Sequence, residues 1–202
     1  MDSKKAKTTF SGGRIKNILS HPNSLTMFRI VAAPVIVVLL LFPNRLCTFA
    51  AALIFSVAAI TDFLDGFLAR QKGLESDFGK LMDPIADKLL VSSSFIMLAS
   101  LGWVPAWIVC IIIGREIAIT GLRNIIAQQG KDVSASSLGK YKTGFQIAAI
   151  IPLLFHYEYF TIDFHAIGTV FLWAALVLTV WSGVDYFIRF KNSIFNNNFI
   201  KE

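Results

Sequence analysis

Four aspartates in the first half of the chain have a spacing that suits metal chemistry. Asp62 and Asp65 stand at i and i+3, and Asp83 and Asp87 stand at i and i+4. In a helix each pair lies on one face, and a short polar turn over 71–78 would fold the two helices into a hairpin that brings these faces together. Four carboxylates would repel one another there unless a cation were bound, and carboxylate oxygens suit Mg²⁺ or Mn²⁺.

Helix capping is the alternative explanation for these acids. Asp83 precedes Pro84, which suits the first turn of a helix, and the helix dipole favours an acid there. Asp62 and Asp65 instead follow the continuous apolar run 49–60, near the end of its helix. The dipole disfavours anions at that end, and an ionised group is costly in apolar surroundings. Capping could therefore account for Asp83 but not for the first pair.

The aspartates belong to a longer pattern, D-x-x-D-G-x-x-A-R-x8-G-x3-D-x3-D, which runs from Asp62 to Asp87. This pattern resembles that of the CDP-alcohol phosphotransferase family, membrane enzymes of phospholipid synthesis, at every fixed position. The resemblance implies two bound Mg²⁺ or Mn²⁺ ions with Asp62, Asp65 and Asp83 as ligands. It also implies that Asp87 completes the second metal site and acts as the general base.

The remaining fixed positions of the pattern are Gly66, Ala69, Arg70 and Gly79. The resemblance implies that the three small residues let the nucleotide of CDP-diacylglycerol approach the backbone, and that Arg70 contacts a phosphate or the cytidine. Close helix packing is the alternative for the first two.

A second segment, Asn23-x-x-Thr26-x-x-Arg29, also resembles members of the family. By the resemblance it would close over the nucleotide of the donor. A helix cap at Asn23 followed by one snorkelling arginine would produce the same pattern.

Basic residues in the second half of the chain indicate an anionic second substrate. Arg115 and Arg123 lie on broadly the same side of one expected helix, and Lys140 and Lys142 enter the next. Arginine forks suit phosphate. Flanking charge explains the two lysines equally well, but Arg115 lies too deep for that explanation. With only Glu116 beside it on the same helix, we expect a further anion near Arg115.

The elements G-R-E-I, L-R and G-K-x-K-T-x-x-Q around these residues are similar to those of family members that use sn-glycerol 3-phosphate as acceptor. Members that use phosphatidylglycerol, as cardiolipin synthases do, or serine or inositol remain alternatives. The resemblance also implies a homodimer, and no nucleic-acid partner is expected.

The composition indicates the scaffold that positions these groups. The chain is 55% hydrophobic, with a mean hydropathy of +0.63, which is typical of a membrane protein rather than a soluble one. The sequence predicts an all-α, polytopic protein whose six transmembrane helices each have close to the roughly 20 residues that a bilayer requires. The expected helices are 24–42, bent near Pro34, 46–69, 79–100, 105–128, 138–156 and 165–190.

Around this six-helix domain, 21–190, we expect a basic tail with an interfacial segment over 1–20 and a C-terminal tail over 191–202. Counted from the outer helix ends, Arg29, Asp62, Asp87 and Arg115 lie about 15–24 Å down a core about 30 Å thick. Charges at such a depth must face one another or water. The sequence therefore predicts a polar cavity open to the cytoplasm and closed at the far side.

A dead-end cavity favours an enzyme over a cation transporter, and no internal repeat of the kind found in many transporters is visible. An intramembrane prenyltransferase is a further alternative, because such enzymes also use aspartate pairs and magnesium. The two cysteines, Cys47 and Cys110, are expected to be small buried residues without a disulfide.

Charge asymmetry predicts the orientation in the cell inner membrane. Among the 19 Lys and Arg residues, only Arg45 falls at the far face. Under the positive-inside rule both termini and the 71–78 turn then face the cytoplasm. Single cysteines at positions 45 and 74, treated with an impermeant maleimide, test this: position 45 should be labelled in intact cells, and labelling of position 74 would overturn the orientation.

Overall fold

The computed structural model describes the backbone of residues 22–72, 77–128, 137–157 and 162–195. Side chains are described over the same ranges except at 22–25, 62–72, 77–81, 83–84, 126–128, 137–138, 140 and 189–195. The tails expected at 1–20 and, in large part, at 191–202 lie outside this description.

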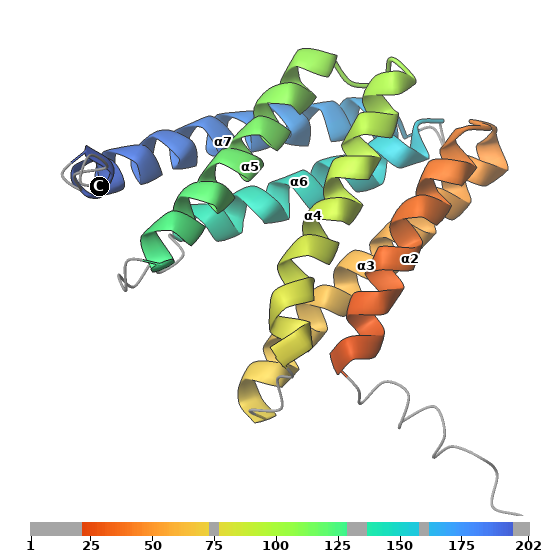
Figure 1. Cartoon of the computed structure of the whole chain (residues 1–202). Coiled ribbons are helices and arrows are strands. Elements are labelled where there is room, and N and C mark those ends of the chain that lie inside the picture. Colours follow the sequence, from red (N-terminus) through yellow and green to blue (C-terminus); the bar gives the residue numbers. More distant parts are fainter. Residues whose placement is uncertain (1–21, 73–76, 129–136, 158–161, 196–202) are drawn as a thin grey trace, which may run out of the picture.

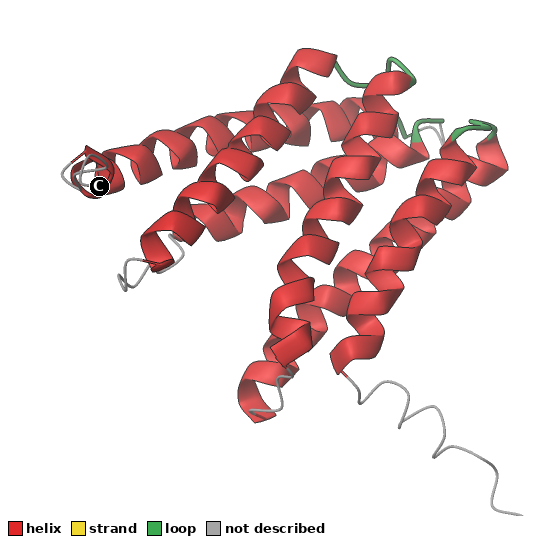
Figure 2. Cartoon of the chain, viewed as in Figure 1, coloured by secondary structure: helices red, strands yellow, loops and turns green. Residues whose placement is uncertain are grey.

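Within these ranges every element is a helix (Figure 2), which confirms the all-α prediction. The helices are α2 (Pro22–Leu40), α3 (Arg45–Lys72), α4 (Asp77–Ser100), α5 (Ala106–Gln128), α6 (Ser137–Phe155) and α7 (Phe164–Phe195). The six expected helices are all present, and the largest difference is at the end of α7, which continues five residues past 190 to Phe195. Pro34 lies inside α2 and Pro152 inside α6.

Consecutive helices run in opposite directions (Figure 1). The turns that follow α2, α4 and α6 gather at one end of the molecule, whereas the start of α2 and the end of α7 lie toward the other. At that second end, α2, α3 and α4 diverge from α5, α6 and α7. We refer to these two sets as the first and second three-helix groups.

The helices are apolar both inside and outside the bundle. On α7, Leu172 and Ala175 are buried, whereas Val170 is 69% exposed and Trp181 65% exposed. A helix that is hydrophobic all round belongs in the core of a large protein or in a bilayer. Among the described residues, Phe164–Ile188 is long and apolar enough to cross a membrane.

Three other helices contain shorter apolar stretches, at Thr26–Leu40, Arg45–Thr61 and Tyr141–Phe155. Small residues on α3, among them Ala51, Ala52 and Ala58, are fully buried and allow close packing.

The cysteines differ from the expectation that both are buried. Cys47 is half-buried, and Cys110 is exposed on α5. In a protein whose outer surface is itself apolar, a small apolar side chain is as compatible with an outward position as with the core, so its type does not predict its burial.

Aromatic packing closes the end at which the turns gather. The His156 ring stacks on Trp103 with centroids 3.7 Å apart and planes 3° from parallel. Tyr157 Oη donates to the carbonyl oxygen of Pro43 at 2.7 Å, and Asp163 Oδ1 caps α7 by accepting from Ala166 N at 3.0 Å. Burial and the neighbouring His165 lower the pKa of His156, partly opposed by Asp163, so a neutral imidazole is favoured in this stack.

The contact between α6 and α7 depends on one glycine. A Cβ atom added at Gly168 would lie 2.6 Å from Leu153 Cγ and 2.9 Å from the backbone nitrogen of Leu153. Backbone cannot rotate away as a side-chain tip can, so any larger residue must separate the two helices.

We therefore expect Gly168→Ala to lower the thermal midpoint of the detergent-solubilised protein, measured by circular dichroism, through overpacking of about 1–3 kcal/mol. Gly121→Ala is the matched control, because a Cβ there meets nothing within 4 Å and alanine favours a helix by about 1 kcal/mol. A Gly168→Ala protein as stable as the wild type would contradict this account of the contact.

Candidate functional site

The four motif aspartates lie on a helical hairpin. Asp62 and Asp65 fall in the second half of α3, and Asp83 and Asp87 in the first half of α4. Because α4 begins at Asp77, Asp83 lies within the helix and cannot be its N-cap, so the capping alternative is wrong. The predicted helix over 79–100 already began before Asp83, and only the capping alternative, based on Asp83-Pro84, required a later start.

Asp87 is the motif aspartate whose side chain the structure describes, and it lines a pocket. The side chains of Asp62, Asp65 and Asp83 are outside the described set, and within that set no three His, Cys, Asp or Glu residues come together. The chemistry of the four motif residues, all carboxylates on one hairpin, fits a hard divalent cation. The other predicted site residues whose side chains are outside the described set are Asn23, Gly66, Ala69, Arg70, Gly79 and Lys140.

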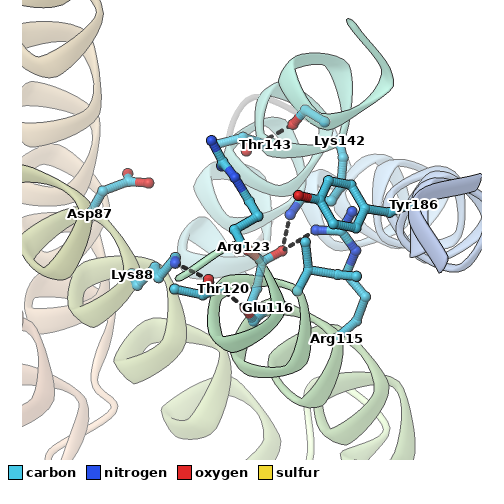
Figure 3. A pocket seen from close by; sticks show the side chains of 11 residues that line it. Asp87, Lys88, Arg115, Glu116, Thr120, Arg123, Lys142, Thr143 and Tyr186 are labelled. Atoms are coloured by element: carbon cyan, nitrogen blue, oxygen red, sulfur yellow. Dashed lines mark hydrogen bonds and ion pairs between the residues drawn. The ribbon is translucent and has the colours of Figure 1, made fainter. Parts of the chain in front are cut away.

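The pocket has a volume of about 330 Å³ and lies between the two three-helix groups (Figure 3). The Asp87 carboxylate, on α4, faces the pocket from the side opposite Lys142 and Tyr186. The lining residues come from four helices: Asp87, Lys88, Arg115, Glu116, Ile119, Thr120, Arg123, Gly139, Lys142, Thr143 and Tyr186.

The pocket brings together three of the four residues predicted for an anionic acceptor. Arg115 and Arg123 line it from α5, which confirms that they share one side of that helix, and Lys142 lines it from α6. Four cations and two acids line the pocket among the described residues, so its formal charge is 4 − 2 = +2. This surplus of positive charge suits a phosphate group.

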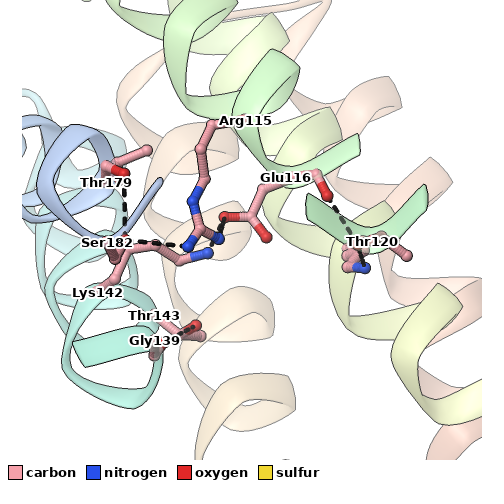
Figure 4. Close-up of polar contacts among 9 residues, drawn as sticks. Arg115, Glu116, Thr120, Gly139, Lys142, Thr143, Thr179 and Ser182 are labelled. Carbon is pink, nitrogen blue, oxygen red and sulfur yellow. Dashed lines mark hydrogen bonds and ion pairs between the residues drawn. The ribbon is translucent and has the colours of Figure 1, made fainter. Parts of the chain in front are cut away.

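Glu116 is the organising acid of the pocket (Figure 4). Its carboxylate forms an ion pair with Lys142, whose side chain crosses from α6 and is only 3% exposed as a residue. The same Oε1 atom lies 3.8 Å from Arg115 Nη1. The expectation that Arg115 must find its anion in a ligand therefore needs correction, because Glu116 serves as an internal counter-ion for two cations.

Two hydroxyls tie the neighbouring helices to α5. Arg115 Nη2 donates to Ser182 Oγ on α7 at 3.0 Å. Thr120 Oγ1 donates to the Glu116 carbonyl at 2.7 Å, which leaves its lone pairs for a hydrogen bond from Lys88 Nζ on α4. Lys88 thus connects the two three-helix groups beside the pocket.

Thr26 and Arg29 of α2 are both buried. With 4% of its surface exposed, Arg29 is not a snorkelling side chain, so that alternative is wrong for this residue. Neither residue is among those that line the pocket, and their contact with a nucleotide stays a prediction.

Sequence reasoning assigned no role to Lys88, Thr120, Ser182 or Tyr186. Lys88 directly follows Asp87, and Ser182 and Tyr186 are polar residues in the apolar helix α7. A polar residue inside an apolar helix is a signal in the sequence that could have identified Ser182 and Tyr186 as site residues. That signal does not indicate which neighbour each residue contacts.

Comparison with known proteins agrees with this arrangement. The family model of CDP-alcohol phosphatidyltransferases matches residues 19–181. The chain is 41% identical over 180 residues to the CDP-diacylglycerol–glycerol-3-phosphate 3-phosphatidyltransferase of Bacillus subtilis, with 83% of this chain and 93% of the relative covered. It is 40% identical over 167 residues to the enzyme of that name from Rickettsia bellii, covering 82% and 92%.

The enzyme of the same name from Shigella flexneri serotype 5b is 38% identical over 169 residues, covering 82% of this chain and 91% of the relative. The matches include both the aspartate hairpin and the helices that carry the basic pocket residues. The chain therefore belongs to the CDP-alcohol phosphatidyltransferase family.

Proposed function

We propose that this protein transfers the phosphatidyl group of CDP-diacylglycerol to sn-glycerol 3-phosphate, which yields phosphatidylglycerophosphate and CMP. The relatives described above are named for this activity. The observation that carries the proposal is that Asp87, the last acid of the motif, opens on the same pocket as Arg115, Arg123 and Lys142. A base and a set of phosphate-binding cations thus share one space.

Members of the family generally use divalent metal ions. Two such ions, Mg²⁺ or Mn²⁺, held by Asp62, Asp65, Asp83 and Asp87, would neutralise the donor pyrophosphate and make its phosphorus easier to attack. On the chain's own side, Arg70 contacts the donor, and Gly66, Ala69 and Gly79 leave room for the nucleotide. Asn23, Thr26 and Arg29 close over it from α2.

In the reaction, Asp87 accepts the proton of the acceptor hydroxyl. The acceptor oxygen then forms a bond to the phosphorus that bears diacylglycerol. The bond from that phosphorus to the oxygen of CMP breaks, and CMP leaves with the electron pair. Because Asp87 opens on the pocket, it can receive this proton from a substrate that occupies the pocket.

The acceptor phosphate fits the charge of the pocket. A phosphate monoester carries about −1.5 to −2 at pH 7, and the described lining sums to +2. Arg115, Arg123 and Lys142 offer several hydrogen-bond donors on one wall of the pocket. Lys140, two residues before Lys142 in the sequence, adds a further cation. At about 330 Å³ the pocket has room for a small polar molecule.

The apolar outer surface supports a position in a bilayer. Acyl chains of the donor remain among the lipids there, while glycerol 3-phosphate enters from the cytoplasm. The proposal includes six spanning helices in the inner membrane, with the cavity and both termini on the cytoplasmic side. The homodimer stays a prediction from the family resemblance.

The metal site can be tested by substitution at each motif aspartate. Asp→Asn at positions 62, 65, 83 and 87 should lower kcat/KM by orders of magnitude, because a ligand or the base is lost while the helix survives. CMP release measured in detergent should stop in EDTA and return with Mg²⁺ or Mn²⁺. Substantial activity in Asp83→Asn would rule out the two-metal site.

The acceptor site predicts a selective effect on one Michaelis constant. Arg115→Ala should raise KM for glycerol 3-phosphate about ten- to hundredfold, which corresponds to a charge-assisted contact of roughly 1.5–3 kcal/mol. KM for CDP-diacylglycerol should change little, because that substrate loses no contact. Arg45→Ala is the control. Arg45 is the first residue of α3 and does not line the pocket, so both constants should stay unchanged.

The acceptor itself is identified in the same assay. CMP release should depend on glycerol 3-phosphate. Release with phosphatidylglycerol in its absence would replace the proposal with a cardiolipin synthase, and ion flux through proteoliposomes without CMP release would indicate a transporter.

A further inference from the structure

Helix α7 contributes a contact to the pocket that the reaction described above does not use. The guanidinium of Arg115 lies between Glu116 on its own helix and Ser182 on α7 (Figure 4). Ser182 is fully buried and its Oγ lies 3.0 Å from Arg115 Nη2. The arginine is therefore held from two directions, by an anion and by a hydroxyl.

The Ser182 hydroxyl is oriented to accept a hydrogen bond from the Arg115 guanidinium. Its Oγ donates to the backbone carbonyl of Thr179 at 3.1 Å, and a hydroxyl has a single proton to donate. The lone pairs of Ser182 are thus left for Arg115. This backbone contact within α7 fixes the acceptor that receives the guanidinium.

The next residue, Gly183, shapes the surface against which the arginine lies. A Cβ atom there would approach Arg115 Cγ to 3.3 Å and Arg115 Nε to 3.7 Å. A glycine at this position lets the stem of Arg115 pack directly on α7. Ser182 and Gly183 therefore together hold the Arg115 side chain. Ser182 accepts a hydrogen bond from its guanidinium, and Gly183 leaves space for its aliphatic part.

A purely structural role for Ser182 is the alternative, since serines in apolar helices commonly bond their own backbone. Ser94 on α4 is such a case: it is equally buried and its hydroxyl donates to the Leu90 carbonyl at 2.8 Å. Ser182 differs because it also receives a charged donor from another helix, and that donor lines the pocket.

We propose that Ser182 and Gly183 are positioning residues for the acceptor phosphate, because they hold Arg115 in the orientation in which it faces the pocket. This inference rests on the proposed function, in which Arg115 binds that phosphate. It assigns to α7 a role in acceptor specificity through Arg115, without contact between α7 and the substrate at these two positions.

The test is a double-mutant cycle on steady-state kinetics in detergent. Ser182→Ala should raise KM for glycerol 3-phosphate about five- to tenfold, as expected for one net hydrogen bond, and leave KM for CDP-diacylglycerol unchanged. In the Arg115→Ala background the same substitution should have no further effect, because the residue through which it acts is gone. Ser94→Ala is the control for loss of a buried hydroxyl and should leave both constants unchanged.

A second variant keeps the inference testable if the Ser182→Ala protein fails to fold. Gly183→Val keeps Ser182 but displaces the stem of Arg115, and it should raise the same KM while KM for CDP-diacylglycerol again reports an intact donor site.

Equal factors for Ser182→Ala with and without Arg115 would overturn the inference, as would equal changes in both Michaelis constants. If Arg115→Ala raises KM for glycerol 3-phosphate but Ser182→Ala and Gly183→Val do not, the inference fails and the proposed acceptor site stands. If Arg115→Ala has no effect on that KM, the acceptor site itself is wrong, and the role of α7 falls with it.

Discussion

One carboxylate, Glu116, allows two cations to lie between helices that are otherwise largely apolar. Removing a charge from water is costly, and a buried pair is tolerated only when the partners lie close and their remaining donors are satisfied. Lys142 is buried and pairs with Glu116, and Arg115 lies 3.8 Å from the same oxygen. Without this acid, Lys142 and Arg115 would lose their shared counter-ion, and holding both charges at these positions would cost more free energy.

The same cluster links the three helices of the second three-helix group beside the pocket. The ion pair joins α5 to α6, and the hydrogen bond from Arg115 to Ser182 joins α5 to α7. Lys88 then connects α4 to Thr120 on α5. Polar contacts thus converge on the pocket while apolar packing holds the rest, so the positions of the charged groups depend on one network rather than on separate local contacts.

Glu116 also adjusts the charge that a ligand meets. The described lining sums to +2 with this acid and would sum to 4 − 1 = +3 without it. Cations already held by a counter-ion need little reorganisation when a phosphate arrives, which reduces the entropic cost of binding. The pocket therefore combines a surplus of positive charge with side chains that are ordered before the substrate binds.

Local features of the sequence determined the helices and the aspartate motif. Apolar runs of spanning length, interrupted by polar turns, predict six helices, and short-range spacing alone places Asp62 with Asp65 on one helix and Asp83 with Asp87 on the next. The predicted start of α4, at residue 79, lies two residues from the observed start at Asp77, whereas the capping alternative suggested by Asp83-Pro84 was wrong.

Only the tertiary structure decided which distant groups meet. The ion pair of Glu116 with Lys142 on α6 and the contact of Arg115 with Ser182 on α7 depend on the rotation and separation of packed helices. When every face of a helix is apolar, the hydrophobic pattern does not show which face turns inward. The sequence therefore indicated that Arg115 needs a further anion at its depth, whereas the packed helices show Glu116, its neighbour on α5, lying near both Arg115 and Lys142.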